Sequence, residues 1–262
     1  MSLKDLFSKN IDVINNSSNA AIKKQLEKEN EEIEKRRLNA LNDQYGIWLS
    51  FVKSHPKSFL VPQQLNMLEQ RNYISFDTLK MIVNKLDSKV KECRDGKKLL
   101  KYIRIKENTQ IGKLAPDFNA VDSNNQPFTL SQFKGKNVVL IELWASYCIP
   151  CLKGFPYLKT MHRKYNQKGF EIIAVSQDLD KKTWMSAIKE EGIDNWYNMA
   201  TQFRQGESLN NNIFQNYPFG PIPRSFLIDK EGKIIGSWGF YSKENEEELD
   251  KILDKLLIKN AI

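Results

Sequence analysis

The pattern of hydrophobic and polar residues divides this chain of 262 residues into two parts, one with helical periodicity and one with short apolar runs between helical stretches. Between residues 17 and 44 apolar residues recur at helical intervals in a stretch rich in Glu, Lys, Gln and Asn, and the pattern continues to His55, where Pro56 interrupts it. Shorter periodic stretches predict three more helices, at residues 62–70, after a cap at Ser75, and at 88–103. Residues 1–111 are therefore expected to form an all-helical region. A polar link is expected at residues 104–114, where this region meets the rest of the chain.

From residue 112 on, short apolar runs alternate with helical stretches. The run from Val138 to Trp144 is apolar almost throughout, as in a strand that is buried on both faces, and Glu142 is its one charged residue. Other strands are expected at residues 116–121, 127–130, 171–176, 224–228 and 233–238, and helices at 148–166, 181–191, 206–215 and from Ser242 or Asn245 to 259. This order predicts a second domain, residues 112–262, with a mixed sheet between helices.

Two cysteines mark the end of the central strand. Cys148 and Cys151 are three residues apart, so one helical turn brings their sulfur atoms together. A helix N-terminus offers unpaired N–H groups and a partial positive charge, and both stabilise a thiolate, the form that attacks disulfides. The spacing therefore suits a reversible dithiol/disulfide pair.

A CxxC pair is also half of many zinc sites, which usually have four ligands. Besides this pair the chain has only Cys93, His55 and His162, so neither a second CxxC nor an HxxxH follows. His162 falls on the helix after the cysteines and is expected at the surface. Redox chemistry is the favoured interpretation, and no metal is expected.

The net charge of +8 is unevenly distributed, with +7 in residues 1–112. This positive charge would favour binding to an anionic lipid surface or an acidic partner, the alternative being a solvated helix surface. The charged run 27–37 lacks the interleaved aromatic residues of a nucleic-acid site. No apolar run is long enough to cross a membrane. The opening Met1-Ser2-Leu3 looks like an artificial leader, so we expect a native signal or lipoprotein segment to be missing.

Four ordered motifs resemble the thioredoxin superfamily. Residues 144–151 resemble its WAxWCxPC active site, and residues 114–118 resemble the APDF opening of the TlpA/ResA-like, AhpC/TSA-type branch. Residues 221–229 and 232–235 resemble the segments that follow in that branch, and residues 51–103 resemble the helical region of cell-envelope oxidoreductases of the Bacteroidetes. The resemblance implies a thioredoxin fold after residue 112.

The resemblance also implies roles for individual residues. Cys148 would be the nucleophile and Cys151 the resolving cysteine, with no cofactor beyond their disulfide. Glu142 matches a buried acid and would accept a proton from Cys151 through a water molecule, the alternative being an ion pair with Lys136 or Lys159. The residues expected to contact substrate are Trp144, Tyr147, Ile149, Pro150, Ile222 and Pro223, the last after a cis peptide bond.

This chain departs from the family pattern at two places. Tyr147 stands where the motif usually has Trp, and Gly154 and Phe155 stand where some ResA-like members carry an acid. The expected activity is thiol–disulfide oxidoreduction of protein substrates. The alternatives are a peroxiredoxin-like thiol peroxidase and a non-enzymatic binding module. We expect a periplasmic or cell-envelope protein, anchored at a membrane that supplies its electron donor; the alternative location is the cytoplasm. No nucleic-acid partner is expected.

Overall fold

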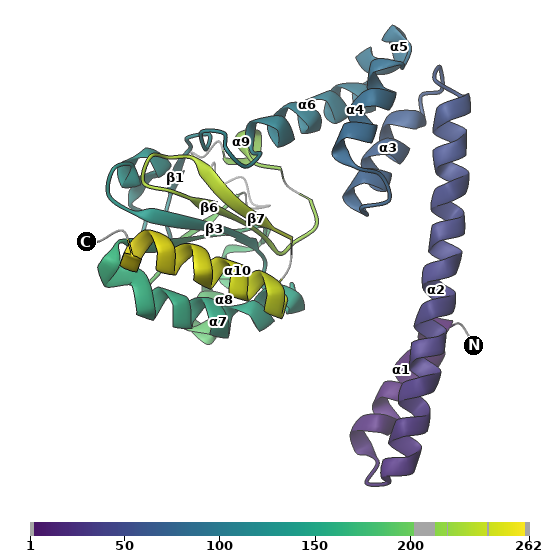
Figure 1. Ribbon diagram of the computed structural model, residues 1–262, viewed down its shortest axis with the longest axis horizontal. Helices are drawn as coiled ribbons and strands as arrows, with labels where there is room; N and C mark the ends of the chain where they lie inside the picture. Colours follow the sequence, from purple (N-terminus) through teal and green to yellow (C-terminus); the bar gives the residue numbers. More distant parts are fainter. Residues whose placement is uncertain (1–2, 202–212, 219, 240, 260–262) are drawn as a thin grey trace. The chain divides into compact units, whose positions relative to one another are not determined.

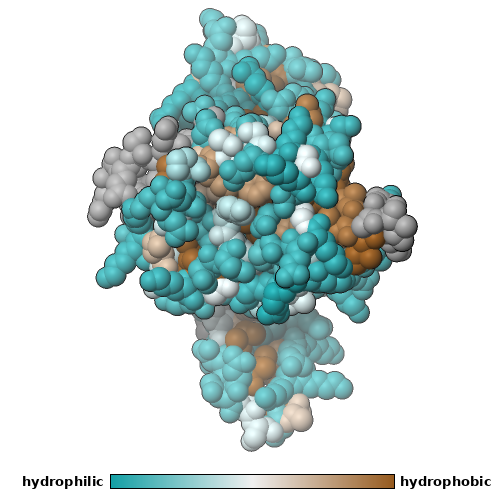
Figure 2. Space-filling view, turned by 90° about the vertical axis from the view of Figure 1, so that its left-hand side faces the viewer, coloured by the Kyte–Doolittle hydropathy of each residue, from teal (hydrophilic) through white to brown (hydrophobic). Residues whose placement is uncertain are grey.

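The computed structural model describes residues 3–201, 213–218, 220–239 and 241–259. It forms two compact units, Met1–Leu100 and Lys101–Ile262 (Figure 1). The surface in Figure 2 is mostly hydrophilic, with hydrophobic residues in small separate areas. None of the described helices is both long and apolar enough to cross a membrane.

The first unit is helical, as the periodicity predicts. Its helices are α1 (Leu3–Asn16), α2 (Ala20–Ser54), α3 (Val61–Gln70), α4 (Phe76–Asn84), α5 (Ser88–Glu92) and α6 (Arg94–Asn108), the last of which continues into the second unit. Asn19 caps α2 by accepting from the N–H groups of Ala21 and Ile22, and the Ser75 hydroxyl caps α4. Helix α1 was not predicted.

The single helix expected at residues 88–103 is wrong, because the chain breaks at Cys93. This residue is extended and its Sγ accepts the N–H of Gly96 at 3.3 Å, at the start of α6. A Cβ at position 96 would overlap the backbone of Val90 and Lys91, so the close approach of α5 and α6 requires glycine. Helix α6 then continues to Asn108, well into the expected polar link.

The second unit is built on a five-stranded mixed sheet in the order β5-β4-β3-β6-β7. Its strands are β3 (Val138–Trp144), β4 (Phe170–Ser176), β5 (Tyr197–Ala200), β6 (Arg224–Ile228) and β7 (Ile234–Trp238). The central strand β3 runs parallel to β4 and antiparallel to β6. The short strands β1 (Asn119–Val121) and β2 (Pro127–Thr129) form a separate hairpin. This arrangement is the thioredoxin fold and confirms the expected fold class.

Helices α7 (Ile149–Tyr165), α8 (Lys181–Glu191) and α10 (Lys243–Asp254) contribute to one hydrophobic cluster on the sheet (Figure 1). Every residue of β3 is buried. The opposite cluster includes the β1–β2 hairpin, the 3-10 turn Leu130–Phe133 and the short helix α9 (Ile213–Asn216). The expected helix at 206–215 lies mostly outside the described residues. The last helix is followed by a π-helical turn, Lys255–Lys259.

Candidate active site

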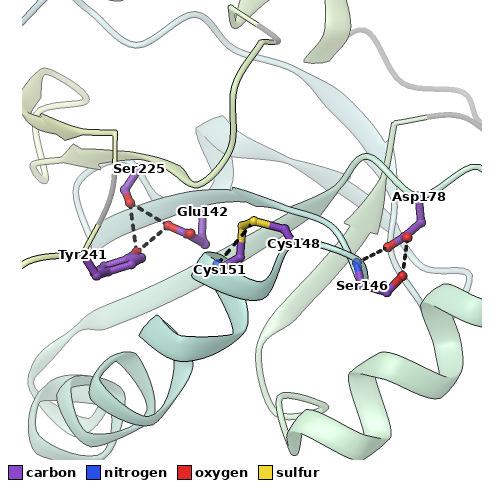
Figure 3. Close-up of a disulfide and its surroundings, with 7 residues drawn as sticks. All are labelled: Glu142, Ser146, Cys148, Cys151, Asp178, Ser225 and Tyr241. Carbon is purple, nitrogen blue, oxygen red and sulfur yellow. Dashed lines mark hydrogen bonds between the residues drawn. A yellow bond between two sulfur atoms is a disulfide. The ribbon is translucent and has the colours of Figure 1, made fainter. Parts of the chain in front are cut away.

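The two cysteines lie where the central strand passes into a helix. Trp144 ends β3, Cys148 is the N-cap of α7, and Cys148 and Cys151 form a disulfide with Cα atoms 5.2 Å apart (Figure 3). Cys148 Sγ accepts the backbone N–H of Cys151 at 3.3 Å. One sulfur of the pair therefore lies at the positive end of a helix, as the spacing predicts.

The residues next to the disulfide differ sharply in exposure. Tyr147 and Ile149 are 69% and 64% exposed, and Pro150 is exposed as well. Trp144, in contrast, is fully buried, with its ring centroid 5.2 Å from that of Phe155. Its side chain supports the helix and has no exposed surface for a substrate, whereas the other three residues are accessible to one.

A second chain segment contributes Ile222 and Pro223, which are joined by a cis peptide bond, as expected. Ile222 is half-buried and packs against both hydrophobic clusters, and Pro223 is buried just before β6 begins. Because β6 pairs with β3, the fold ties this segment to the strand that leads to Cys148.

Glu142 lies inside the protein, beneath the disulfide segment. Side chains alternate along a strand, so Glu142 faces the same side as Leu140 and Trp144, which pack with Cys151 in the cluster beneath α7. Figure 3 shows the carboxyl group between the disulfide and two hydroxyl groups. Burial raises the pKa of Glu142 from its ordinary 4.5 to about 8, and hydrogen bonds from the two hydroxyl groups oppose this rise.

Those hydroxyl groups belong to Ser225 and Tyr241, which the sequence analysis did not single out. Ser225 Oγ donates to Glu142 Oε2 at 2.6 Å, and the Tyr241 hydroxyl donates to the same oxygen at 2.5 Å. The other oxygen, Oε1, accepts no hydrogen bond from the described residues. The ion pair considered as an alternative is not formed: Lys159 donates to the carbonyl of Glu191, and no salt bridge among the described residues joins Glu142 to Lys136.

A second buried carboxylate, also missed, holds the loop before Cys148. Asp178 accepts from the Ser146 N–H at 3.0 Å, from the Ser146 hydroxyl at 2.6 Å and from the Ser176 hydroxyl at 2.6 Å. It is only 3% exposed. Asp178 lies two residues after the end of β4. In a parallel β3–β4 pair the two strand ends meet at one edge of the sheet, which is the signal that could have found this residue.

The surface position expected for His162 is wrong. It is 5% exposed, and its Nε2 lies 3.3 Å from Glu171 Oε2 and 3.1 Å from Asn166 Nδ2. The cause is the face of α7 on which it lies, because Leu158 and Tyr165 on neighbouring turns are also buried.

Among the residues that the structure describes, no three His, Cys, Asp or Glu side chains are grouped to hold a metal ion.

Comparison with known proteins finds a family model, relatives and solved structures to which this chain is similar. The family model described as Redoxin matches residues 110–253. The thiol-disulfide oxidoreductase ResA of Bacillus anthracis is 35% identical over 155 residues, which are 59% of this chain and 83% of that protein. The ResA of Bacillus subtilis (strain 168) is 32% identical over 130 residues, 50% of this chain and 68% of that protein. The crystal structure of the thioredoxin domain of a thiol-disulfide oxidoreductase from Bacteroides vulgatus is 28% identical, with 55% of this chain and 98% of that chain covered and a TM-score of 0.47.

Proposed function

Because this chain belongs to the Redoxin family and is a thiol–disulfide oxidoreductase, we propose that it reduces or exchanges protein disulfides through Cys148 and Cys151. The observation that carries the proposal is the disulfide at the start of α7. Cys148 is the N-cap, is 6% exposed and is flanked by the exposed Tyr147 and Ile149, whereas Cys151 is fully buried. This difference supports a nucleophilic role for Cys148 and a resolving role for Cys151.

In the reducing direction the Cys148 thiolate attacks a substrate disulfide. A bond forms between Cys148 and one substrate sulfur, and the other substrate sulfur leaves as a thiolate that takes a proton from water. The Cys151 thiol then gives its proton to the Glu142 carboxylate, and the resulting thiolate attacks Cys148. The second substrate sulfur leaves as a thiolate that takes a proton from water. The substrate dithiol now holds the two electrons, and the protein is left oxidised as the Cys148–Cys151 disulfide.

Glu142 suits the role of proton acceptor because it is buried next to the cluster that holds Cys151. A carboxyl group with a pKa of about 8 exchanges its proton near neutral pH, where a general base is most effective. Oxygen Oε1, which has no described hydrogen-bond partner, is the oxygen available to receive that proton.

The substrate would lie over the exposed rim of the disulfide. Tyr147, Ile149 and Pro150 offer apolar surface, and the backbone at Ile222 and Pro223 can pair with an extended substrate segment. Trp144 would act through its packing beneath them. An apolar rim makes no demand on substrate charge.

An insulin-reduction assay with dithiothreitol as electron source tests this function. Wild-type protein should accelerate reduction and Cys148→Ser should abolish the acceleration, whereas Cys93→Ser should match wild type. Equal rates for wild type and Cys148→Ser would contradict the proposed reductase and favour the non-enzymatic binding module. Turnover of peroxide that outpaces insulin reduction would instead favour the peroxidase alternative.

We further propose that the division at residue 112 separates chemistry from positioning. A folded fragment of residues 112–262 should keep the insulin-reductase activity of the full chain, because the cysteines, Glu142 and its partners all lie within it. Complete loss of activity in a folded fragment would show that the helical region completes the site.

For the cell, we propose a protein that acts in the periplasm or cell envelope, anchored at the membrane, where a membrane electron donor restores its reduced cysteines. The basic helical region and the resemblance to envelope oxidoreductases support this location. Fractionation of the native organism tests it, and a purely cytosolic pool would refute it. Redox titration against glutathione determines the direction of the reaction.

A further inference from the structure

Three polar groups form a triangle of close contacts beside the disulfide. Ser225 Oγ and the Tyr241 hydroxyl both bond Glu142 Oε2, and they lie 2.9 Å from each other (Figure 3). The three residues come from β6, from the segment after β7 and from β3. Oε2 is thus fully occupied, and proton exchange is left to Oε1.

The ring of Tyr241 is held in place by a glycine of the cysteine helix. A Cβ at Gly154 would overlap the Cδ2, Cε2 and Cγ atoms of Tyr241, so the ring lies directly against the backbone of α7. Gly154 follows Cys151 by three residues, which is about one helical turn along the same face. The side chain that bonds Glu142 is therefore packed on the turn next to the resolving cysteine.

From this geometry we propose that Tyr241, seated on Gly154, is a positioning residue for the second step of disulfide exchange: its hydroxyl keeps the Glu142 carboxylate able to ionise and so to accept the Cys151 proton. The proposal rests on the proposed function. Tyr241 need not touch the substrate or either sulfur atom.

The electrostatic surroundings of Glu142 show why a donor matters. Around Glu142 lie the Cys148–Cys151 disulfide, Ser225 of β6 and Tyr241 after β7 (Figure 3). Tyr157 of α7 lies against Tyr241, with ring centroids 6.4 Å apart, and no salt bridge among the described residues involves Glu142. Burial favours the neutral carboxyl, and hydrogen bonds to the charged form are the main opposing effect.

Tyr241 is a dependable donor. Its burial and the neighbouring Glu142 carboxylate raise the pKa of its phenol well above the usual 10, so the hydroxyl keeps its proton throughout the working pH range. Removing the Tyr241 hydroxyl would disfavour ionised Glu142 and raise the pH at which that carboxyl ionises. The Cys151 proton would then have an acceptor only in more alkaline solution.

Stopped-flow reaction of the reduced protein with Ellman's reagent separates the two steps. The first nitrothiobenzoate is released when Cys148 attacks the reagent, and the second when Cys151 displaces it from Cys148. In Tyr241→Phe we expect the pH midpoint of the second release to rise by about one unit and its rate at neutral pH to fall roughly tenfold, with the first release unchanged. An unshifted midpoint overturns the proposal.

Controls distinguish positioning from general damage. Tyr157→Phe removes a neighbouring hydroxyl that donates to the Glu246 carbonyl, and it should leave the midpoint unchanged. Gly154→Ala displaces the Tyr241 ring without removing its hydroxyl, and it should shift the midpoint in the same direction as Tyr241→Phe.

A double variant keeps this inference separate from the proposed function. Tyr241→Phe should have no further effect on the second release in Glu142→Gln; a full additional slowing would show that the hydroxyl acts without Glu142 and would overturn the proposal. A wild-type protein that releases no second nitrothiobenzoate would instead refute the proposed dithiol function.

Discussion

Cys148 Sγ lies 3.3 Å from the backbone nitrogen of Cys151 and accepts its N–H group at the first turn of α7. The helix therefore offers its N-terminal dipole and an N–H donor to one sulfur only. When the disulfide is reduced, the same groups favour a thiolate at Cys148 over one at Cys151. The backbone hydrogen bond thus supports the proposed roles of Cys148 as nucleophile and Cys151 as resolving cysteine.

Alkylation of the reduced protein at mildly acidic pH should therefore label Cys148 first. Iodoacetamide followed by peptide mass spectrometry measures each site, with Cys148→Ser as the control for background labelling. Cys151 has no exposed surface, and Cys93 lies outside the active site, so both should lag by roughly tenfold or more. Equal labelling of all three cysteines would contradict the assignment of Cys148.

Replacing Glu142 with Gln should slow the resolution of a mixed disulfide and leave the alkylation of Cys148 nearly unchanged. Gln keeps the shape and can still accept from Ser225 and Tyr241, but it cannot take up a proton. We expect a loss of about 10² in the second step at neutral pH, measured with Ellman's reagent, because general-base catalysis contributes at least this much. If mixed-disulfide release kept its wild-type rate across neutral pH, Glu142 would have no part in the reaction.

The same carboxyl should make stability fall as pH rises. In the folded protein the pKa of Glu142 is about 8 and in the unfolded chain it is near 4.5, so the folded state retains a proton that the unfolded state releases. Stability should therefore decline between about pH 4.5 and pH 8 and level off above, by at most ~5 kcal/mol.

Urea unfolding of the oxidised protein measures this effect in wild type and Glu142→Gln. A Trp48→Phe background leaves only tryptophans of the second unit as fluorescent probes. As pH rises, the free energy of unfolding of Glu142→Gln should exceed that of wild type by an increasing amount. Parallel curves from pH 5 to pH 8 would show that the carboxyl is not protonated in the folded state.

Asp178→Ala should destabilise the second unit and loosen the loop before Cys148. Three donors of Ser146 and Ser176 lose their acceptor, and hydrogen bonds to a carboxylate are worth about 1.5–3 kcal/mol each before the site relaxes. We expect a loss of roughly 3 kcal/mol in urea unfolding. The matched control is Asp180→Ala, two residues on, which removes an exposed cap of α8 and should cost only about 1 kcal/mol. Equal losses would remove any special role for Asp178.

The elements that are set by local sequence were predicted well. Strand β3 runs from Val138 to Trp144 as expected, because a short apolar run with a single charge is most readily buried as a central strand. Helix α8 was predicted to the residue, since Asp180 caps its start and Gly192 ends it in a left-handed conformation. The cysteine pair and its place at the start of a helix were equally visible.

What escaped prediction depends on contacts across the fold. Ser225 and Tyr241 follow Glu142 by 83 and 99 residues, and only the pairing of β3 with β6 brings the first of them opposite it. Strand β5 is four residues long and takes its conformation from β4, so its own sequence carries little signal. The burial of His162 depends on which face of α7 meets the sheet.

The late arrival of β6 in the chain has a consequence for folding. Until Arg224–Ile228 pairs with it, β3 is an edge strand with open N–H and C=O groups, and such edges template aggregation. Glu142, ionised while solvent still reaches it, is the kind of inward-pointing charge that discourages edge-to-edge pairing. Glu142→Gln should therefore scatter more light on refolding from urea, even though its finished fold is the more stable one. The residue would then protect the growing polypeptide before it serves any chemistry.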